Sequence, residues 1–225
     1  MNSTTGHKII AIDGPAASGK SSVARELARR LGFAYVNSGA LYRAMTWLVL
    51  ERGIPPANAA AIGQLAERAA ISCELRDLDS LILIDGVDPE PFLREDRVNE
   101  NVSLVSRVPR LREILVDHLR RSGEANDLVM EGRDIGSVVF PQTPFKFYID
   151  ASPDIRRRRR EAQGQRDHIT VRDEADSSRR FSPLIIAEDA HVIDSSNLTI
   201  DGVVGEIIGR LKMKGLDVDH VWARR

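Results

Sequence analysis

Cysteine is nearly absent from the sequence, and Cys73 is the single residue of its kind. One thiol excludes an intramolecular disulfide and a zinc site built on cysteines, and it fits a reducing compartment. Long apolar runs are absent as well, and nothing approaches the ~20 apolar residues of a membrane span. Near the N-terminus the apolar run from Ile9 to Ile12 ends at Asp13, so it is too short for the core of a signal peptide. We therefore expect a cytoplasmic protein without a membrane partner.

No charge of one sign dominates the chain, since 32 Lys and Arg residues stand against 33 Asp and Glu residues. Such a balance creates no chain-wide field that would attract nucleic acid, so any anion must be bound locally. The 225 residues, 42% of them hydrophobic, suffice for one sizeable core and are few for two independent domains. We expect a single domain over residues 1–225 that is a monomer and binds no nucleic acid.

Short apolar segments alternate with segments of helical periodicity along most of the chain. The predicted strands are 8–13, 34–36, 127–130, 145–149 and 192–194, and the predicted helices are 20–31, 39–52, 59–70, 98–119, 153–162 and 202–213. Alternation of this kind indicates a parallel sheet with helices on both faces. Two further strand-like pieces, 71–75 and 81–84, come with a turn signal at Asp85-Gly86 and indicate an inserted antiparallel element.

The sharpest motif is a glycine-rich loop that fits the pattern G-x-x-x-x-G-K-S/T between a predicted strand and a predicted helix. It consists of Gly14, Pro15, Ala16, Ala17, Ser18, Gly19, Lys20 and Ser21, with Ser22 directly after it. In such a loop the backbone N–H groups and the helix N-terminus hold the β-phosphate, Lys20 reaches the β- and γ-phosphates, and Ser21 offers its hydroxyl to Mg²⁺. The motif predicts ATP or GTP with Mg²⁺, and it does not choose among a kinase, an ATPase and a GTPase.

We have two structural expectations for this loop. Lys20 is expected to be exposed, with no part in packing. Ala17 is expected to avoid a positive φ, because left-handed backbone costs alanine on the order of 1 kcal/mol. The alternative is a glycine-containing turn that binds no ligand. The presence of Lys20 and Ser21 between a predicted strand and a predicted helix argues against it.

A second polar segment, from Asn37 to Arg43, follows the second predicted strand. The carboxyl edge of an open α/β sheet is where ligands bind, so Arg43 could form a forked contact to an acceptor phosphate. Equally, Ser38 could be the N-cap of the next helix and Arg43 a surface residue. The residues alone leave both interpretations open.

Five consecutive arginines, from Arg156 to Arg160, occupy less than two turns of a predicted helix, where like charges at i, i+4 repel each other. An anion would relieve that repulsion. This favours a lid helix whose arginines, Arg156 and Arg160 among them, neutralise the phosphates of ATP. The alternatives are a solvated basic face and a weak contact to RNA.

Four motifs, in this order, resemble those of the bacterial cytidylate kinases. They are the segments from Gly14 to Ser22, from Asn37 to Arg43, from Glu131 to Pro141 (EGRDIGSVVFP) and from Arg172 to Arg179 (RDEADSSR). The resemblance implies the P-loop NTPase fold, with three α/β/α layers around a central parallel sheet, a small antiparallel β insertion at about 55–97 and an arginine lid at about 153–180. It implies that the γ-phosphoryl group of ATP is transferred, with Mg²⁺, to CMP or dCMP.

The resemblance also implies roles for individual residues. The cytosine ring would be recognised by Ser38, Arg112 and Asp134, the acceptor phosphate held by Arg43 and Arg133, and the pentose contacted by Ser103, Arg172 and Asp176, while Arg179 would close near base and phosphate. The implied catalytic residues are Lys20, Arg43, Arg133, Asp134 and Arg179. Cytosine presents an amino donor beside its acceptors N3 and O2, which fits an acceptor such as Asp134 or Ser38 and a donor such as Arg112. A salt bridge from Asp134 to its neighbour Arg133 is the alternative.

Two rival functions keep part of this pattern. A kinase for UMP, AMP or shikimate would keep the phosphate loop and would not need Ser38, Arg112 and Asp134. A nucleotide-driven, RNA-associated ATPase would use the arginine run and would hydrolyse ATP without an acceptor. The segment between Arg160 and Arg172 is also shorter than the helical arm expected of a cytidylate kinase lid.

Overall fold

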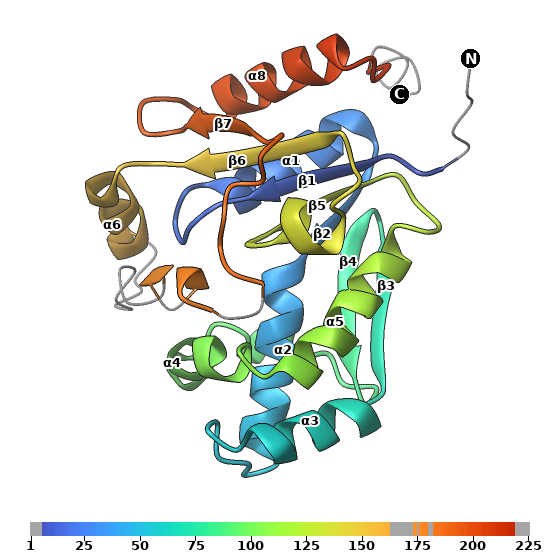
Figure 1. Ribbon diagram of the computed structural model, residues 1–225, viewed down its shortest axis with the longest axis vertical. Helices are drawn as coiled ribbons and strands as arrows, with labels where there is room; N and C mark the ends of the chain where they lie inside the picture. Colours follow the sequence, from blue (N-terminus) through green and yellow to red (C-terminus); the bar gives the residue numbers. More distant parts are fainter. Residues whose placement is uncertain (1–5, 163–172, 175, 180–181, 219–225) are drawn as a thin grey trace.

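The computed structural model describes residues 6–162, 173–174, 176–179 and 182–218 of the chain. Within them a seven-stranded sheet has the order β3-β4-β2-β5-β1-β6-β7 (Figure 1). Five of these strands form the centre and one side of the sheet and run parallel: β1 (Ile9–Asp13), β2 (Ala34–Asn37), β5 (Leu128–Gly132), β6 (Phe145–Asp150) and β7 (His191–Asp194). A sixth, β4, is parallel to β2, and only β3 is antiparallel to its neighbour. The sheet confirms the central parallel sheet that the strand pattern predicts.

Helices follow most of the strands. They are α1 (Lys20–Leu31), α2 (Ser38–Glu51), α3 (Ala59–Arg68), α4 (Asp96–Val105), α5 (Pro109–Ser122), α6 (Pro153–Ala162) and α8 (Ile200–Met213), with a short 3₁₀ helix η1 (Glu90–Phe92) and a π-helical turn η2 (Ile135–Val139). In Figure 1, α8 lies above strands β1 and β6, and α2 to α5 lie below them, on the side where β4 and β3 continue the sheet. No helix among the described residues is both long and apolar enough to span a bilayer.

Both faces of the parallel sheet are buried under helices. Ile10 and Ile12 of β1 share one core with α1 and α8, whereas Ile9 and Ala11 share a second core with α2, α4 and α5. Successive residues of a strand point to opposite faces, so a strand covered on both sides is an unbroken apolar run in the sequence. This arrangement confirms the predicted three-layer α/β/α architecture.

The predicted antiparallel element is a hairpin of β3 (Ile71–Arg76) and β4 (Asp79–Ile84). It extends the central sheet rather than forming a separate one, because Asp79 pairs with Tyr35 of β2. The hairpin turn is Asp77-Leu78, where φ is 51° and 69°, as in a type I′ turn. The predicted turn signal, Asp85-Gly86, makes a second tight turn just after β4.

The single helix predicted at 98–119 is wrong, because α4 ends at Val105 and α5 begins at Pro109. Proline fits the first turn of a helix, where its missing N–H is not needed, and it pushes the preceding residue out of the helical region. Val108 is accordingly extended, with φ −66° and ψ 116°. At this break the carbonyl oxygen of Ser106 accepts a hydrogen bond from the side chain of Arg112 at 3.1 Å.

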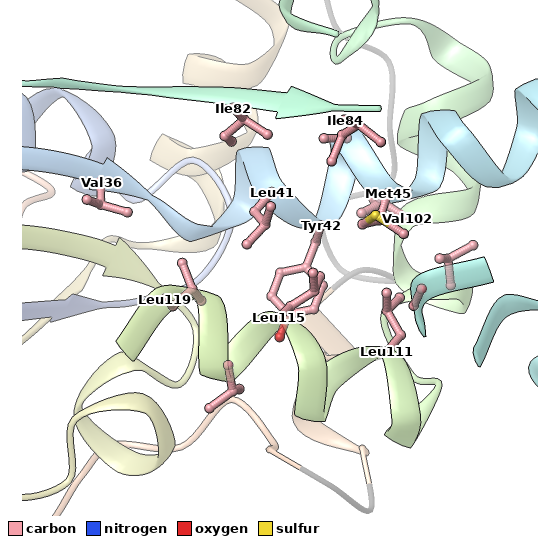
Figure 2. Close-up of a cluster of buried hydrophobic side chains, with 14 of the residues drawn as sticks. Val36, Leu41, Tyr42, Met45, Ile82, Ile84, Val102, Leu111, Leu115 and Leu119 are labelled. Atoms are coloured by element: carbon pink, nitrogen blue, oxygen red, sulfur yellow. The ribbon is translucent and has the colours of Figure 1, made fainter. Parts of the chain in front are cut away.

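The core between α2 and α5 fixes the helices that carry two predicted binding residues. Figure 2 shows side chains of α2 facing side chains of α5, namely Leu41, Tyr42 and Met45 opposite Leu111, Leu115 and Leu119. Burying one side chain of this size contributes about 1.5–3 kcal/mol. Arg43 and Arg112 directly follow residues of this core, so its packing sets their positions.

Candidate active site

The phosphate loop leaves β1 at Asp13 and enters α1 at Lys20. Gly14 has a φ of 155°, and a Cβ there would lie 2.1 Å from the carbonyl oxygen of Ile149, so only glycine fits. Lys20 is buried, which contradicts the expected exposure, and its Nζ donates to the carbonyl oxygen of Pro15 at 3.0 Å. The lysine is thus held along the loop by the loop's own backbone.

Ala17 has a φ of 59°, so the expectation that it avoids the left-handed region is wrong. The loop has to turn its backbone between two fixed ends, β1 and α1, and Gly19 at the start of α1 is also left-handed, with φ 90°. Packing of those two elements holds alanine in a conformation that costs about 1–2 kcal/mol. The local preference of Ala17 is overridden by the elements on either side.

Glu131 is a site residue that the sequence argument missed. It lies on β5 beside β1, is buried, and its Oε1 accepts a hydrogen bond of 2.7 Å from the hydroxyl of Ser21. A P-loop serine and an acidic residue of a neighbouring strand are the protein groups that hold Mg²⁺ in P-loop NTPases. The sequence does indicate this residue, because Glu131 directly follows three apolar residues of a predicted strand and so lies at a strand end.

Asn37, rather than Ser38, is the N-cap of α2. The Asn37 side chain accepts from a backbone N–H of the first turn at 3.0 Å, whereas the Ser38 hydroxyl donates to the carbonyl oxygen of Glu131 at 2.9 Å. Arg43 is half-buried and donates to Oδ1 of Asn99 at 2.6 Å. Ser38 is therefore not the N-cap of α2, and Arg43 is not a fully exposed surface residue.

Arg112 and Asp134 form an ion pair in which each side chain is only 4% exposed. Asp134 is thus paired with Arg112, and the alternative pair with Arg133 does not occur among the described residues. The Arg112 guanidinium also lies 4.9 Å from the centre of the Tyr42 ring, a cation–π contact. Its Nε is buried without a hydrogen-bond partner in the described part of the chain. A buried N–H of this kind is costly unless an acceptor, such as a ligand, satisfies it.

Asp176 binds two further guanidinium groups. Its Oδ2 accepts from Nε of Arg133 at 2.8 Å, and its Oδ1 accepts from Nη2 of Arg179. Arg133 also donates to the carbonyl oxygen of Gly14, and Arg179 to the hydroxyl of Ser106, each at 3.0 Å. Burial, opposed by the charge of Asp176, lowers the pKa of Arg179. The carboxylate predicted to contact the pentose thus holds two arginines in place.

This part of the site has an excess of positive charge. Three guanidinium groups face two carboxylates here, namely Arg112, Arg133 and Arg179 with Asp134 and Asp176. Lys20, Arg43 and Arg160 line the same pocket, against one further carboxylate, that of Glu131. Like charges repel strongly where the dielectric constant is low, and a bound phosphate would remove the excess. The arrangement is suited to a small phosphorylated ligand.

α6 lies against the phosphate loop, so its arginines are not simply a solvated basic face. Arg156 donates to the carbonyl oxygen of Ala16 and Arg159 to that of Ser18, each at 3.2 Å. Arg156 also pairs with Asp173, whose carboxylate accepts from the backbone N–H of Ala16 at 3.1 Å. These contacts place Arg156 and Arg159 at the phosphate loop, whereas Arg157 and Arg158 are exposed.

One pocket joins the phosphate loop to the arginine cluster. The predicted site residues that line it are Ala16, Ala17, Gly19, Lys20, Ser21, Ser22, Ser38, Arg43, Ser103, Arg112, Arg133, Asp134, Arg160, Asp176 and Arg179. Tyr42, Ser106 and Glu131 line it without having been predicted. Gly14, Pro15, Ser18 and Arg156 belong to the loop or contact it and are not part of the lining. Arg172 lies outside the described residues.

Fold and site together define a P-loop phosphotransferase, in which the phosphate loop at the carboxyl edge of a parallel sheet opens into a pocket rich in arginine side chains. A family model for cytidylate kinase matches residues 10–213, and the chain belongs to that family of nucleoside monophosphate kinases.

Proteins similar to this chain are found in several bacteria. The cytidylate kinase of Desulforamulus reducens is 42% identical over 215 residues, which are 91% of this chain and 96% of that protein. The cytidylate kinase of Mycobacterium leprae is 42% identical over 218 residues, 92% of this chain and 96% of that protein. Among solved structures, a shikimate kinase from Acinetobacter baumannii in complex with shikimate has a TM-score of 0.46 and 15% identity, over 94% of this chain and 96% of that one.

Proposed function

We propose that this protein transfers the γ-phosphoryl group of ATP to CMP or dCMP, which yields ADP and CDP or dCDP. One observation carries the proposal: the buried pair of Arg112 and Asp134, with its unpartnered Nε, lies in the same pocket as the phosphate loop. A donor beside an acceptor is what the edge of cytosine requires, because its amino group stands next to N3 and O2. Membership of the cytidylate kinase family supports the same acceptor.

On the donor side, the N–H groups of the loop and the N-terminus of α1 would hold the phosphates of ATP, with Lys20 at the β- and γ-phosphates. Ser21 and Glu131 fit a Mg²⁺ site, since a hydroxyl and a carboxylate already meet there. The described residues contain no cluster of three or more His, Cys, Asp or Glu side chains that could hold an ion alone. Mg²⁺ commonly takes one or two protein oxygens beside phosphate oxygens and water. When bound, the ion neutralises charge on the transferring phosphates.

On the acceptor side, Arg43 and Arg133 would hold the 5′-phosphate. An acceptor phosphate is already a nucleophile, so the chain has to align two phosphates and neutralise charge rather than supply a strong base. Arg133 suits this task, because its donation to Gly14 links the acceptor pocket to the phosphate loop. From the lid, Arg156 and Arg160 would act on the ATP phosphates as charge develops.

The nucleoside would be held by the remaining pocket residues. Asp134 and Ser38 would accept from the cytosine amino group, and Arg112 would donate to its acceptor edge. The pentose would be contacted by Ser103, Asp176 and Arg172, with Arg179 closing over base and phosphate. We also infer that the segments at about 55–97 and 153–180 are the parts that close over the monophosphate and over ATP.

We further infer a monomer that works in the cytoplasm and needs neither nucleic acid nor a membrane. Cys73 is a free thiol, and burial raises its pKa to about 11, which keeps it unreactive in a reducing compartment.

ADP release, measured with each nucleoside monophosphate in turn, tests the proposed reaction. We expect CMP and dCMP to be the best acceptors, with kcat/KM for UMP and AMP at least about tenfold lower and no turnover of shikimate. Equal ADP release with and without an acceptor would identify an ATPase. A preference for UMP, AMP or shikimate would keep the kinase class and overturn the assignment of the acceptor.

Arg43→Ala is expected to lower kcat/KM for CMP by about thirty- to a thousandfold, roughly 2–4 kcal/mol, because a charged contact to the acceptor phosphate is lost. The KM for ATP should change by no more than about twofold. Arg52→Ala is the matched control, since Arg52 caps the same helix and forms an exposed ion pair with Asp85. Steady-state kinetics with each substrate varied would check this. An equal loss for ATP and CMP would show that Arg43 does not hold the acceptor phosphate.

A further inference from the structure

Asp13 is a buried acid to which the reaction described above gives no role. It is the last residue of β1, directly before Gly14 of the phosphate loop, and its side chain is almost completely buried. Burial raises its pKa to about 7, and hydrogen bonds from the backbone N–H groups of Gly136 and Ile135 oppose that rise. Keeping a carboxylate in such a place is costly, so its two bonds need an explanation beyond packing.

The two bonds tie β1 to the chain that follows β5. Oδ1 of Asp13 accepts from the N–H of Ile135 and Oδ2 from the N–H of Gly136, each at 2.8 Å. These N–H groups begin η2, and Asp134 at its N-cap position makes no side-chain cap of its own. Asp13 therefore caps this turn from a neighbouring strand.

The capped turn carries two of the proposed binding residues. Arg133 and Asp134 directly precede Ile135. Arg133 forms an ion pair with Asp176, and Asp134 forms one with Arg112. The backbone here has little room to move, because a Cβ on Gly132 would lie 2.4 Å from the Ser38 hydroxyl. Arg133 also donates to the carbonyl oxygen of Gly14, so residues 13 and 14 hold both the backbone and a side chain of this turn.

We propose that Asp13 is a positioning residue whose carboxylate fixes the Arg133–Asp134 turn against the phosphate loop and thereby aligns the acceptor pocket with the donor phosphates. This inference rests on the proposed function, in which Arg133 holds the acceptor phosphate and Asp134 the base. Asp13 itself touches neither substrate. A displacement of the turn by a fraction of an ångström would misalign the two phosphates, which enzymes of this kind must hold in near-attack geometry.

Asp13→Asn tests the proposal, because its side chain keeps one acceptor oxygen and turns an N–H₂ group toward a backbone N–H. We expect kcat/KM for the acceptor to fall at least about tenfold, while the KM for ATP stays within about twofold. The ratio of kcat/KM for CMP to that for UMP should fall as well, since the direction of Asp134 is disturbed.

Thr143→Val is the matched control, because the Thr143 hydroxyl donates to the carbonyl oxygen of Ile9 at the opposite end of β1. It should lower the melting temperature and leave both KM values and the CMP to UMP ratio unchanged. If Asp13→Asn behaves like Thr143→Val, or loses ATP and acceptor use equally, the proposal is overturned.

If Asp13→Asn does not fold, Gly136→Ala is the second test of the proposal. A Cβ at this position would lie 3.2 Å from the Lys146 side chain and 3.4 Å from Oδ2 of Asp13. The contact with Lys146 is tighter than ordinary van der Waals contact, and relieving it shifts the turn relative to Asp13. The variant should therefore show the same selective loss for the acceptor, and unchanged acceptor kinetics would overturn the proposal. Acceptor kcat/KM and KM values are measured with the acceptor that the wild-type enzyme prefers, and the other pyrimidine monophosphate is used only for the ratio. A wrong assignment of cytidylate would therefore appear in the wild-type enzyme, and a wrong role for Asp13 only in the variants.

Discussion

Lys20→Ala is expected to abolish phosphoryl transfer while the protein keeps its fold. The ammonium of a P-loop lysine reaches the β- and γ-phosphates, and removing one such group from a preorganised site lowers kcat by about a hundred- to a thousandfold or more. The folded state loses the hydrogen bond from Lys20 to the carbonyl oxygen of Pro15, a contribution of about 1 kcal/mol. Turnover with ATP and CMP, and circular dichroism on the same preparation, would check both parts.

Because Lys20 is buried, the effect of its charge has to be separated from that of its packing. Lys20→Met keeps a long unbranched side chain and removes the ammonium, so it should be as inactive as Lys20→Ala and at least as stable. Turnover close to the wild-type rate in Lys20→Met would remove the lysine from the mechanism.

The phosphate loop was predictable from the sequence because its chemistry lies in eight consecutive residues. The helices α1 and α6 also lie at the predicted residues, since their apolar or charge patterns and their ends are local. The failures near these segments have local causes as well. The backbone conformation of Ala17 is imposed by β1 and α1 and differs from the one that alanine prefers. Pro109 begins a new helix although the apolar periodicity continues across it.

The acceptor pocket depends on pairs of residues that are far apart in the chain. Arg43 donates to Asn99, Arg112 to Asp134 and Arg133 to Asp176. The sequence around each arginine contains no pattern that predicts its partner. The implied roles of these arginines came from the resemblance to a family, and their protein partners became known only with the fold.

Glu131 and Asp13 show the same limit in acidic residues. Each directly follows a short apolar segment that can be recognised in the sequence as a strand. Their partners, the hydroxyl of Ser21 and the backbone of the turn after Asp134, are brought near only because β1 and β5 lie side by side. Sequence patterns identify such candidates, and the pairing of strands decides what they do.

Asp134→Asn is expected to erase or reverse the preference for CMP over UMP. In the wild-type enzyme uracil would place a carbonyl oxygen against the Asp134 carboxylate, and an unpaired buried group costs about 1–3 kcal/mol, which predicts at least a tenfold preference for CMP. The amide of Asp134→Asn keeps an oxygen for Arg112 and offers an N–H₂ donor that suits the uracil carbonyl. We therefore expect kcat/KM for CMP to fall by about a hundredfold, while that for UMP is unchanged or rises.

This substitution also removes a charge from a buried ion pair, and breaking such a pair costs about 3–5 kcal/mol of stability. Unfolding lowers kcat/KM for both acceptors by the same factor, so the ratio of the two values reports on the pocket alone. Asp79→Asn is the matched control, since Asp79 accepts from Arg25 in an exposed pair outside the pocket, and its ratio should equal that of the wild-type enzyme. If the wild-type enzyme uses CMP and UMP equally, or if Asp134→Asn leaves the ratio unchanged, Asp134 does not read the base. Equal use of CMP and UMP by the wild-type enzyme would make the pocket that of a kinase for both pyrimidine monophosphates, whereas an unchanged ratio in the variant would assign the reading of the base to other residues.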